Sequence, residues 1–219
     1  ADTFVSTIGS ANICTQVGYD ETTTTDYSSI AQAVIDNGCD SVMMVSYAAD
    51  GGMIIDELVG NMQFTGQIYG GDGIAEEGLG ADMADNSTVA GIIASKPHNP
   101  NPMGEVGYVF AALCGANPAC AGGIYTAEAF DAVTIAAFAA FTYLANNGTI
   151  SSELVVAGTG QGWNGASGGI NFLANGDIIP AGFCIGEFTV TTADGVNTLS
   201  YDCARYWDPT NGVTSAVTV

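Results

Sequence analysis

Residues 40–46, with the sequence DSVMMVS, decide the fold class of this chain. The centre of the stretch, Val42 to Val45, is apolar without interruption, which is typical of a strand buried on both faces of a parallel sheet. The residues before it, Tyr27 to Asp36, carry apolar side chains at helical spacing, and Asp26 is a good helix N-cap. Asn37-Gly38 then ends this helix. The sequence therefore places a helix directly before a buried strand.

The same alternation continues on both sides of this stretch. We expect strands at 12–19, 67–69 and 89–94, with helices at 1–8 and 51–61. Strands that alternate with helices form a parallel sheet with right-handed crossovers. The sequence thus predicts an α/β protein with a parallel, Rossmann-like sheet.

The pattern changes at residues 96–102 (KPHNPNP), where three prolines indicate an extended connector. Residues 103 to 146 then favour helices alone, at 106–113 and 126–145. From about Ile150 the chain favours strands and turns, and it ends in a hairpin, 183–191 with 197–204, around Asp194-Gly195. We therefore divide the chain at 1–96, 97–149 and 150–219.

The charge balance excludes several functions. Two basic residues, Lys96 and Arg205, stand against 23 acidic ones, and the net charge is −21. Such a surface repels phosphate backbones and anionic membranes, so we expect no nucleic-acid partner. The acidity is typical of a solvated surface in a salty or extracellular medium, and clustered calcium sites are the alternative.

The six cysteines favour disulfides and not a metal site. There is no CxxC pair, and the single histidine, His98, cannot complete a zinc site of the usual spacing. We expect an oxidising location, periplasmic or extracellular. Fifteen pairings are possible, and the layout favours bridges within these three pairs: Cys14 with Cys39, Cys114 with Cys120, and Cys184 with Cys203.

One apolar stretch requires a test for a membrane span. Residues 132–145 are apolar, but 14 residues are too few to cross a bilayer, and Glu128 and Asp131 precede them. No Lys or Arg flanks the stretch. We therefore predict a buried helix and no membrane span.

Motifs of catalysis and of cofactor binding are missing from the sequence. There is no HExxH, no P-loop and no GxSxG elbow. A GxGxxG match at 160–165 is followed by residues that will not form a helix, so it offers no phosphate site. Paired acids such as Glu76 and Glu77 are typical of solvated loops. We expect no catalytic residue and no cofactor.

Two predicted strand ends carry groups suited to binding. Ser46 and Tyr47 follow the run at 42–45, and Gly71 and Asp72 follow the strand at 67–69. Ligands of open parallel sheets bind beyond the carboxyl ends of the strands. A tyrosine can stack on an apolar group, and a carboxylate can hold an ammonium or amide donor. A rim tyrosine and a plain Asp-Gly turn are the alternatives.

The order of motifs resembles the type I periplasmic binding proteins, in the group of ABC-transporter receptors for branched-chain amino acids and amides. The resemblance runs along nearly the whole chain and rests on five segments: 26–30 (DYSSI), 39–47 (CDSVMMVSY), 70–73 (GGDG), 125–133 (YTAEAFDAV) and 165–177 (GASGGINFLANGD). Phe130-Asp131 stands where the family usually has Tyr-Asp.

The resemblance implies a two-lobed receptor that closes on a solute. Residues 1–96 and 150–219 would belong to lobe 2, and 97–149 would hold a crossover and helices of lobe 1. Tyr47 and Asp72, with Ser46 and Gly71, would contact the solute, and Tyr125 would lie near the hinge. The implied partners are an amino acid or amide and the permease of an ABC importer. The helices in 103–146 would pack on a missing N-terminal lobe or on another chain. A structural subunit of an extracellular assembly is the alternative function.

Overall fold

The computed structural model describes most of the chain, in two compact units. The described residues are 2–97, 105–117, 120, 125–149, 163–173, 175–179, 182–208 and 211–215. The first unit comprises residues 1–96 and 185–204, and the second comprises 97–184 and 205–219. Strands β6 (Phe183–Ala193) and β7 (Val196–Asp208) contribute residues to both units.

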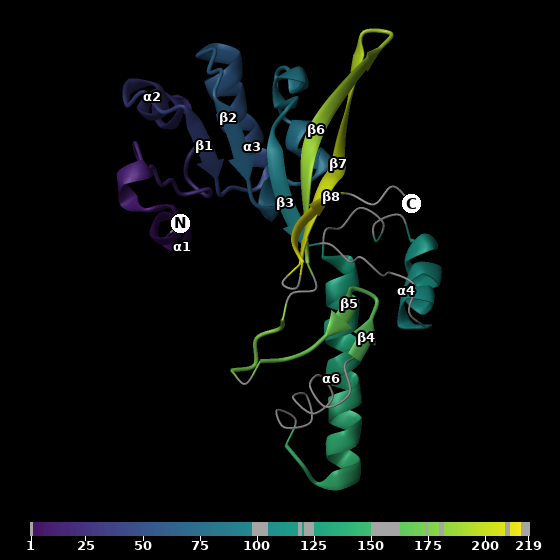
Figure 1. Ribbon diagram of the computed structural model, residues 1–219. Coiled ribbons are helices and arrows are strands. Elements are labelled where there is room, and N and C mark those ends of the chain that lie inside the picture. Colours follow the sequence, from purple (N-terminus) through teal and green to yellow (C-terminus); the bar gives the residue numbers. More distant parts are fainter. Residues whose placement is uncertain are drawn as a thin grey trace. The chain divides into compact units, whose positions relative to one another are not determined.

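The first unit has the parallel α/β architecture that the sequence predicts (Figure 1). Strand β1 pairs in parallel with β2, and β2 pairs in parallel with β3. The elements up to β3 are α1 (Asp2–Ile8), η1 (Ser10–Asn12), α2 (Ser28–Asp36), β1 (Ser41–Met44), α3 (Ala48–Ile55), η2 (Asp56–Asn61), β2 (Gln67–Gly70), η3 (Asp72–Ile74), η4 (Glu77–Gly80), η5 (Asn86–Val89) and β3 (Ile93–Pro97).

A six-stranded sheet has the strand order β1-β2-β3-β6-β7-β8. Strands β6 (Phe183–Ala193) and β7 (Val196–Asp208) form the predicted hairpin, and β8 (Gly212–Ser215) pairs antiparallel with the end of β7. The turn residues Asp194 and Gly195 both have positive φ, 53° and 76°, as a tight hairpin turn requires. The predicted Asp-Gly turn is therefore confirmed.

The core of the first unit is apolar and gathers side chains from every helix and strand of the α/β part except α1 and η1. Removing each such side chain from water contributes about 1.5–3 kcal/mol. The fully buried members with the largest volumes are Phe188, Ile55, Leu58, Ile74, Leu79 and Val89.

Three expectations about strands in the first unit are wrong. The run at 42–45 is not buried on both faces, since Met43 is 38% exposed and Val45 is 68% exposed. Residues 12–19 form no strand: η1 ends at Asn12, and the chain then runs outside any ladder. The strand expected at 89–94 begins only at Ile93, because Gly91 has a φ of 82° and interrupts the extended chain. Val89 and Ile92 are nevertheless buried, so the apolar pattern reflects the core and not the ladder.

The second unit contains two helices and a small hairpin among its described residues. They are α4 (Glu105–Gly115), α6 (Thr126–Asn146), β4 (Trp163–Gly165) and β5 (Gly168–Ile170), and β4 pairs antiparallel with β5. Helix α6 is not the buried helix that the sequence suggests: Phe141 is 78% exposed and Leu144 is 77% exposed. By length and composition α6 could cross a membrane, a test that core helices of soluble proteins also meet.

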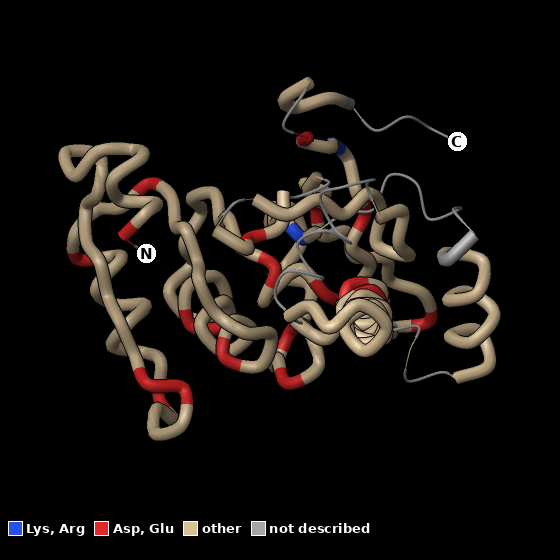
Figure 2. The backbone as a smooth tube through the Cα atoms, turned by 90° about the horizontal axis from the view of Figure 1, so that it is seen from below, with Lys and Arg blue, Asp and Glu red and all other residues tan. Residues whose placement is uncertain are grey.

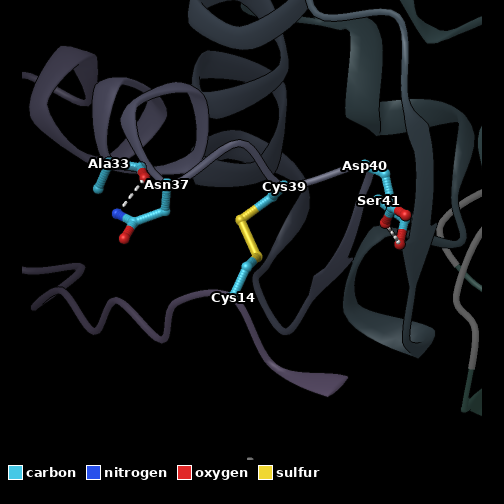
Figure 3. Close-up of a disulfide and its surroundings, with 6 residues drawn as sticks. All are labelled: Cys14, Ala33, Asn37, Cys39, Asp40 and Ser41. Atoms are coloured by element: carbon cyan, nitrogen blue, oxygen red, sulfur yellow. Dashed lines mark hydrogen bonds between the residues drawn. A yellow bond between two sulfur atoms is a disulfide. The ribbon is translucent and has the colours of Figure 1, made fainter. Parts of the chain in front are cut away.

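All six cysteines are disulfide-bonded. Cys14 forms a disulfide with Cys39 (Figure 3). This bond ties the chain at Cys14, just before the irregular residues 15–20, to the loop before β1. Cys114 joins Cys120 across the end of α4. Cys184 and Cys203 are disulfide-bonded as well. The first two predicted pairs are therefore confirmed.

The acidic residues are distributed along the chain and not gathered in one cluster (Figure 2). Among the described residues, no group of three His, Cys, Asp or Glu side chains could hold a metal ion.

Candidate functional site

Four of the five predicted binding residues line one cavity in the first unit. Ser46, Tyr47, Gly71 and Asp72 all contribute to its wall, and its volume is about 1000 Å³. Ser46 and Gly71 are 25 positions apart in sequence, as are Tyr47 and Asp72. The parallel pairing of β1 with β2 brings the two strand ends together. The structure thus joins the two strand ends that the sequence analysis selected.

Backbone contacts hold the loop after β1 against the loop after β2. Met44 and Gly70 are register partners at the carboxyl ends of β1 and β2, and the Gly71 N–H donates a hydrogen bond to the Met44 carbonyl at 3.3 Å. A Cβ at Gly73 would lie 2.3 Å from the carbonyl oxygen of Ser46. Only glycine permits this approach, so Gly73 sets the distance between the loops.

Tyr47 and Asp72 both present their side chains to solvent at this edge. Tyr47 is the N-cap residue of α3 and is 66% exposed. Asp72 is exposed and begins η3. A large aromatic side chain left exposed at a cavity mouth can contact a ligand without displacing core packing.

Tyr19 is a cavity residue that the sequence analysis missed. Its hydroxyl shares a hydrogen bond with Ser46 Oγ, and it lines the same cavity. Burial raises the pKa of Tyr19, and the charges of Asp50 and Glu21 raise it further, so the hydroxyl remains protonated at physiological pH. Its position at the end of an apolar alternation, Ile13 to Tyr19, is a strand-end signal that could have identified it.

A second tyrosine, Tyr27, links the segment that carries Tyr19 to helix α3. The Tyr27 hydroxyl donates to Asp50 Oδ1 at 2.8 Å, and the rings of Tyr19 and Tyr27 meet edge to face with centroids 5.5 Å apart. The hydrogen bond to Asp50, together with desolvation, raises the pKa of Tyr27 to about 12. This network connects the 19–27 segment to the first turn of α3 beside Tyr47.

The cavity wall is acidic. Asp20, Glu21 and Asp72 line it, and none of the lining residues is Lys, Arg or His. An anionic ligand would meet only negative charges from this wall, whereas an ammonium or amide nitrogen would find acceptors. The wall therefore favours a cationic or neutral nitrogen donor.

The fifth predicted residue, Tyr125, belongs to the second unit. It is the N-cap residue of α6 and is 46% exposed. His98 and the glycines of the 160–162 stretch lie outside the described residues.

No protein-family model and no curated protein matches the sequence. Solved structures do match the fold. The leucine-binding protein LivK of Thermotoga maritima matches with a TM-score of 0.66 at 19% identity, over 89% of this chain and 52% of that one. An ABC-transporter solute-binding protein of R. palustris, in complex with 4-hydroxybenzoate, matches with a TM-score of 0.61 at 17% identity, over 85% and 50%.

A third structure is the branched-chain amino acid transporter substrate-binding protein LivJ of Streptococcus pneumoniae, in complex with isoleucine. Its TM-score is 0.55 at 19% identity, over 82% of this chain and 50% of that one. This chain spans about half the length of the structures that it matches. The chain therefore has the type I periplasmic-binding-protein fold, over about half of its extent in those proteins.

Proposed function

We propose that this chain captures a small polar solute, an amino acid or an amide, as the binding component of an ABC importer. Capture would take place at the carboxyl ends of β1 and β2 and would involve no covalent chemistry. The structures that share the fold are described as solute- or substrate-binding proteins. Fold alone does not fix function, so the proposal depends on the site.

The observation that carries the proposal is the convergence of Ser46, Tyr47, Gly71 and Asp72 on one cavity. Parallel sheets bind ligands at this edge, because short loops after the strands face the same space. Here one loop offers a hydroxyl and an exposed ring, and the other offers a backbone and a carboxylate. In the proposal, Asp72 holds the nitrogen of the solute and Tyr47 covers its apolar part.

The charge of the wall supports a nitrogen donor over an aromatic acid. The R. palustris protein is in complex with 4-hydroxybenzoate, an anion at neutral pH. A carboxylate solute would lie near Asp20, Glu21 and Asp72 without a basic partner in this wall. Like charges in a partly dehydrated site repel, so we expect amines or amides to bind more tightly.

A partner for the exposed face of α6 is part of the proposal. Val133, Phe138, Phe141 and Leu144 leave between 50% and 78% of their surface exposed. Leaving several such side chains in water costs on the order of 1.5–3 kcal/mol each. We propose that the half of the fold that this chain does not contain, or another chain, covers this face.

The disulfides support a periplasmic or extracellular location. Bridges persist in oxidising compartments and are rare where thiols are kept reduced, and all six cysteines are bonded. The net charge of −21 suits a soluble receptor and repels an anionic membrane surface.

Titration calorimetry with the Asp72→Ala variant tests the proposed contact. The change should weaken capture of an amine-bearing solute by about 1–3 kcal/mol, the usual loss for an unpaired charged hydrogen bond. Asp82→Ala is the matched control, since Asp82 is an exposed carboxylate that does not line the cavity. Equal affinities for both variants would remove Asp72 from the site.

A further inference from the structure

Two segments of the sequence match the acceptor motif for N-linked glycosylation, Asn-x-Ser/Thr. They are Asn86-Ser87-Thr88 and Asn147-Gly148-Thr149. In a secreted protein this motif indicates a surface loop that carries a glycan. The disulfides support the periplasmic or extracellular location proposed above, and the inference rests on that location. Because the motif is short and also arises by chance, the surroundings of each asparagine decide whether it can serve as an acceptor.

The motif at 147–149 lies in an exposed turn directly after helix α6. Asn147 is the C-cap residue of α6 and has the left-handed αL conformation, with a φ of 54° and a ψ of 27°. Both Asn147 and Thr149 are exposed, and residues 147–149 belong to no helix or strand. An enzyme can therefore reach both side chains without unwinding regular structure.

The motif at 86–88 is held within the fold. Asn86 begins η5 and is only partly exposed. A Cβ at Gly80 would lie 3.0 Å from the Cβ of Asn86, so this side chain packs closely on the end of η4. The Ser87 N–H donates to the Asp85 carboxylate at 2.9 Å, and the Thr88 hydroxyl donates to the Asp85 carbonyl at 2.8 Å. An enzyme would have to open this turn before it could bind the motif.

We propose that Asn147 is the attachment site of an N-linked glycan and that Asn86 is not. The donor is an oligosaccharide joined through a diphosphate to a membrane lipid. The side-chain nitrogen of Asn147 forms a bond with C1 of the first sugar, and the bond between C1 and the diphosphate oxygen breaks. The lipid diphosphate leaves with the electron pair, and the nitrogen releases one proton. The transfer needs no oxidant or reductant.

A glycan at this position changes the hydration of the end of α6. The sequence from Ala132 to Ser152 contains no charged residue, although the net charge of the chain is −21. Phe141 and Leu144 are exposed in the last turns of the helix. A glycan on Asn147 adds a large, solvated group where the chain has no charges of its own. A helix cap alone explains an asparagine in the αL conformation, but it does not require a threonine two residues later.

Mass spectrometry of the chain from its native cells gives the first test. Trypsin cuts after Lys and Arg, and the chain has only 2 such residues, so a protease that cuts at acidic residues is the better choice. Asp131 and Glu153 flank one motif, and Asp85 and Glu105 flank the other. We expect the fragment with Asn147 to be heavier by one glycan, and the fragment with the other motif to have the mass of the bare peptide. A bare Asn147, or a glycan on the other motif, would overturn the proposal.

Transfer in vitro tests whether the fold selects the acceptor. The chain, made with its disulfides in cells that lack N-glycosylation, is incubated with a lipid-linked oligosaccharide and an oligosaccharyltransferase that requires only Asn-x-Ser/Thr. Peptides spanning 82–92 and 143–153 are the unfolded references, and both should accept the glycan. In the folded chain, Asn147 should react at a rate within about threefold of its peptide, and Asn86 at least about tenfold more slowly than its peptide. Equal slowing at the two asparagines would overturn the proposal.

Three variants connect the modification to the motif. Asn147→Gln removes the acceptor and Thr149→Ala removes the hydroxyl, so both should abolish the glycan. Thr149→Ser keeps a hydroxyl and should retain the glycan. No solute enters either assay, so these results are independent of the proposed capture at Tyr47 and Asp72. A glycan that persists in Thr149→Ala at the level found in Thr149→Ser would overturn the proposal.

Discussion

Asp131 is the residue on which the described hairpin of the second unit depends. It is only 1% exposed, and its carboxylate accepts hydrogen bonds from the N–H groups of Ala166 and Ser167, at 2.7 and 2.6 Å, and from Ser167 Oγ at 2.6 Å. A Cβ at Gly165 would lie 2.3 Å from this carboxylate. Two of the motifs that carry the family resemblance, around Phe130-Asp131 and around Gly165, therefore meet at one contact.

Replacing Asp131 should destabilise the second unit. Asp131→Ala leaves two buried N–H groups and a hydroxyl without their acceptor, and each unpaired group costs about 1–3 kcal/mol. We expect a loss of about 3 kcal/mol or more, followed through the fluorescence of Trp163 in β4. Asp177→Ala, which alters an exposed carboxylate bonded to Asn175, is the control. Similar unfolding midpoints for the two variants would contradict the structural role of Asp131.

Two tyrosines with raised pKa values, Tyr27 and Tyr201, predict a loss of stability at high pH. The pKa of Tyr27 is raised to about 12 by its hydrogen bond to Asp50 and by desolvation, and that of Tyr201 is raised to about 12 by burial. In the unfolded chain these groups ionise near pH 10. Above that pH the unfolded chain releases protons that the folded chain retains, so stability is complete below about pH 10 and falls as the pH rises to about 12.

Denaturant titrations from about pH 9 to about pH 12 check this expectation. Tyr27→Phe should reduce the fall, whereas Tyr108→Phe, which alters an exposed tyrosine of α4, should leave it intact. A fall that is identical in both variants would mean that Tyr27 does not hold its proton in the folded chain.

At the scale of elements, the sequence predicted several helices and strands from their helical or alternating apolar period. Strands β1 and β2, helices α2 and α6 and the hairpin around Asp194-Gly195 all appear where expected. The prediction of a strand at 12–19 is wrong, since a strand also needs a hydrogen-bonded neighbour, which local periodicity does not reveal. Of the site, Ser46, Tyr47, Gly71 and Asp72 could be predicted as strand ends. The hydrogen bond of Tyr19 with Ser46 could not, because it is a tertiary contact between residues 27 positions apart.

Two disulfides, Cys14–Cys39 and Cys114–Cys120, should contribute unequally to the free energy of unfolding. Cys14–Cys39 closes a loop with a sequence separation of 25, and Cys114–Cys120 closes one of 6. Loop-closure entropy then gives about 3.5 kcal/mol for the first and about 2 kcal/mol for the second. We expect the double Cys→Ser variant of Cys14 and Cys39 to unfold at lower denaturant than that of Cys114 and Cys120. The opposite order would show that the longer loop is already constrained in the unfolded chain.

At the scale of the whole molecule, α6 leaves a large apolar surface. Phe138, Phe141 and Leu144 follow one another at three-residue spacing and are at least 50% exposed. The chain should therefore bind a hydrophobic dye, and the double variant Phe141→Ser, Leu144→Ser should bind much less of it. Val196→Ser, at an exposed hairpin residue, should not change the signal. Absence of dye binding by the unmodified chain would mean that this face is already covered.

Solute capture by the edge beyond β1 and β2 is the central claim, and an NMR titration of the backbone amides tests it most directly. With amino acids and small amides as solutes, we expect the signals of Ser46, Tyr47 and residues 71–73 to shift together and to saturate, while those of residues 191–197 at the hairpin tip remain in place. 4-Hydroxybenzoate should shift them less. Saturable shifts at Tyr125 or elsewhere in the second unit, with no change at Tyr47 and Asp72, would contradict the claim.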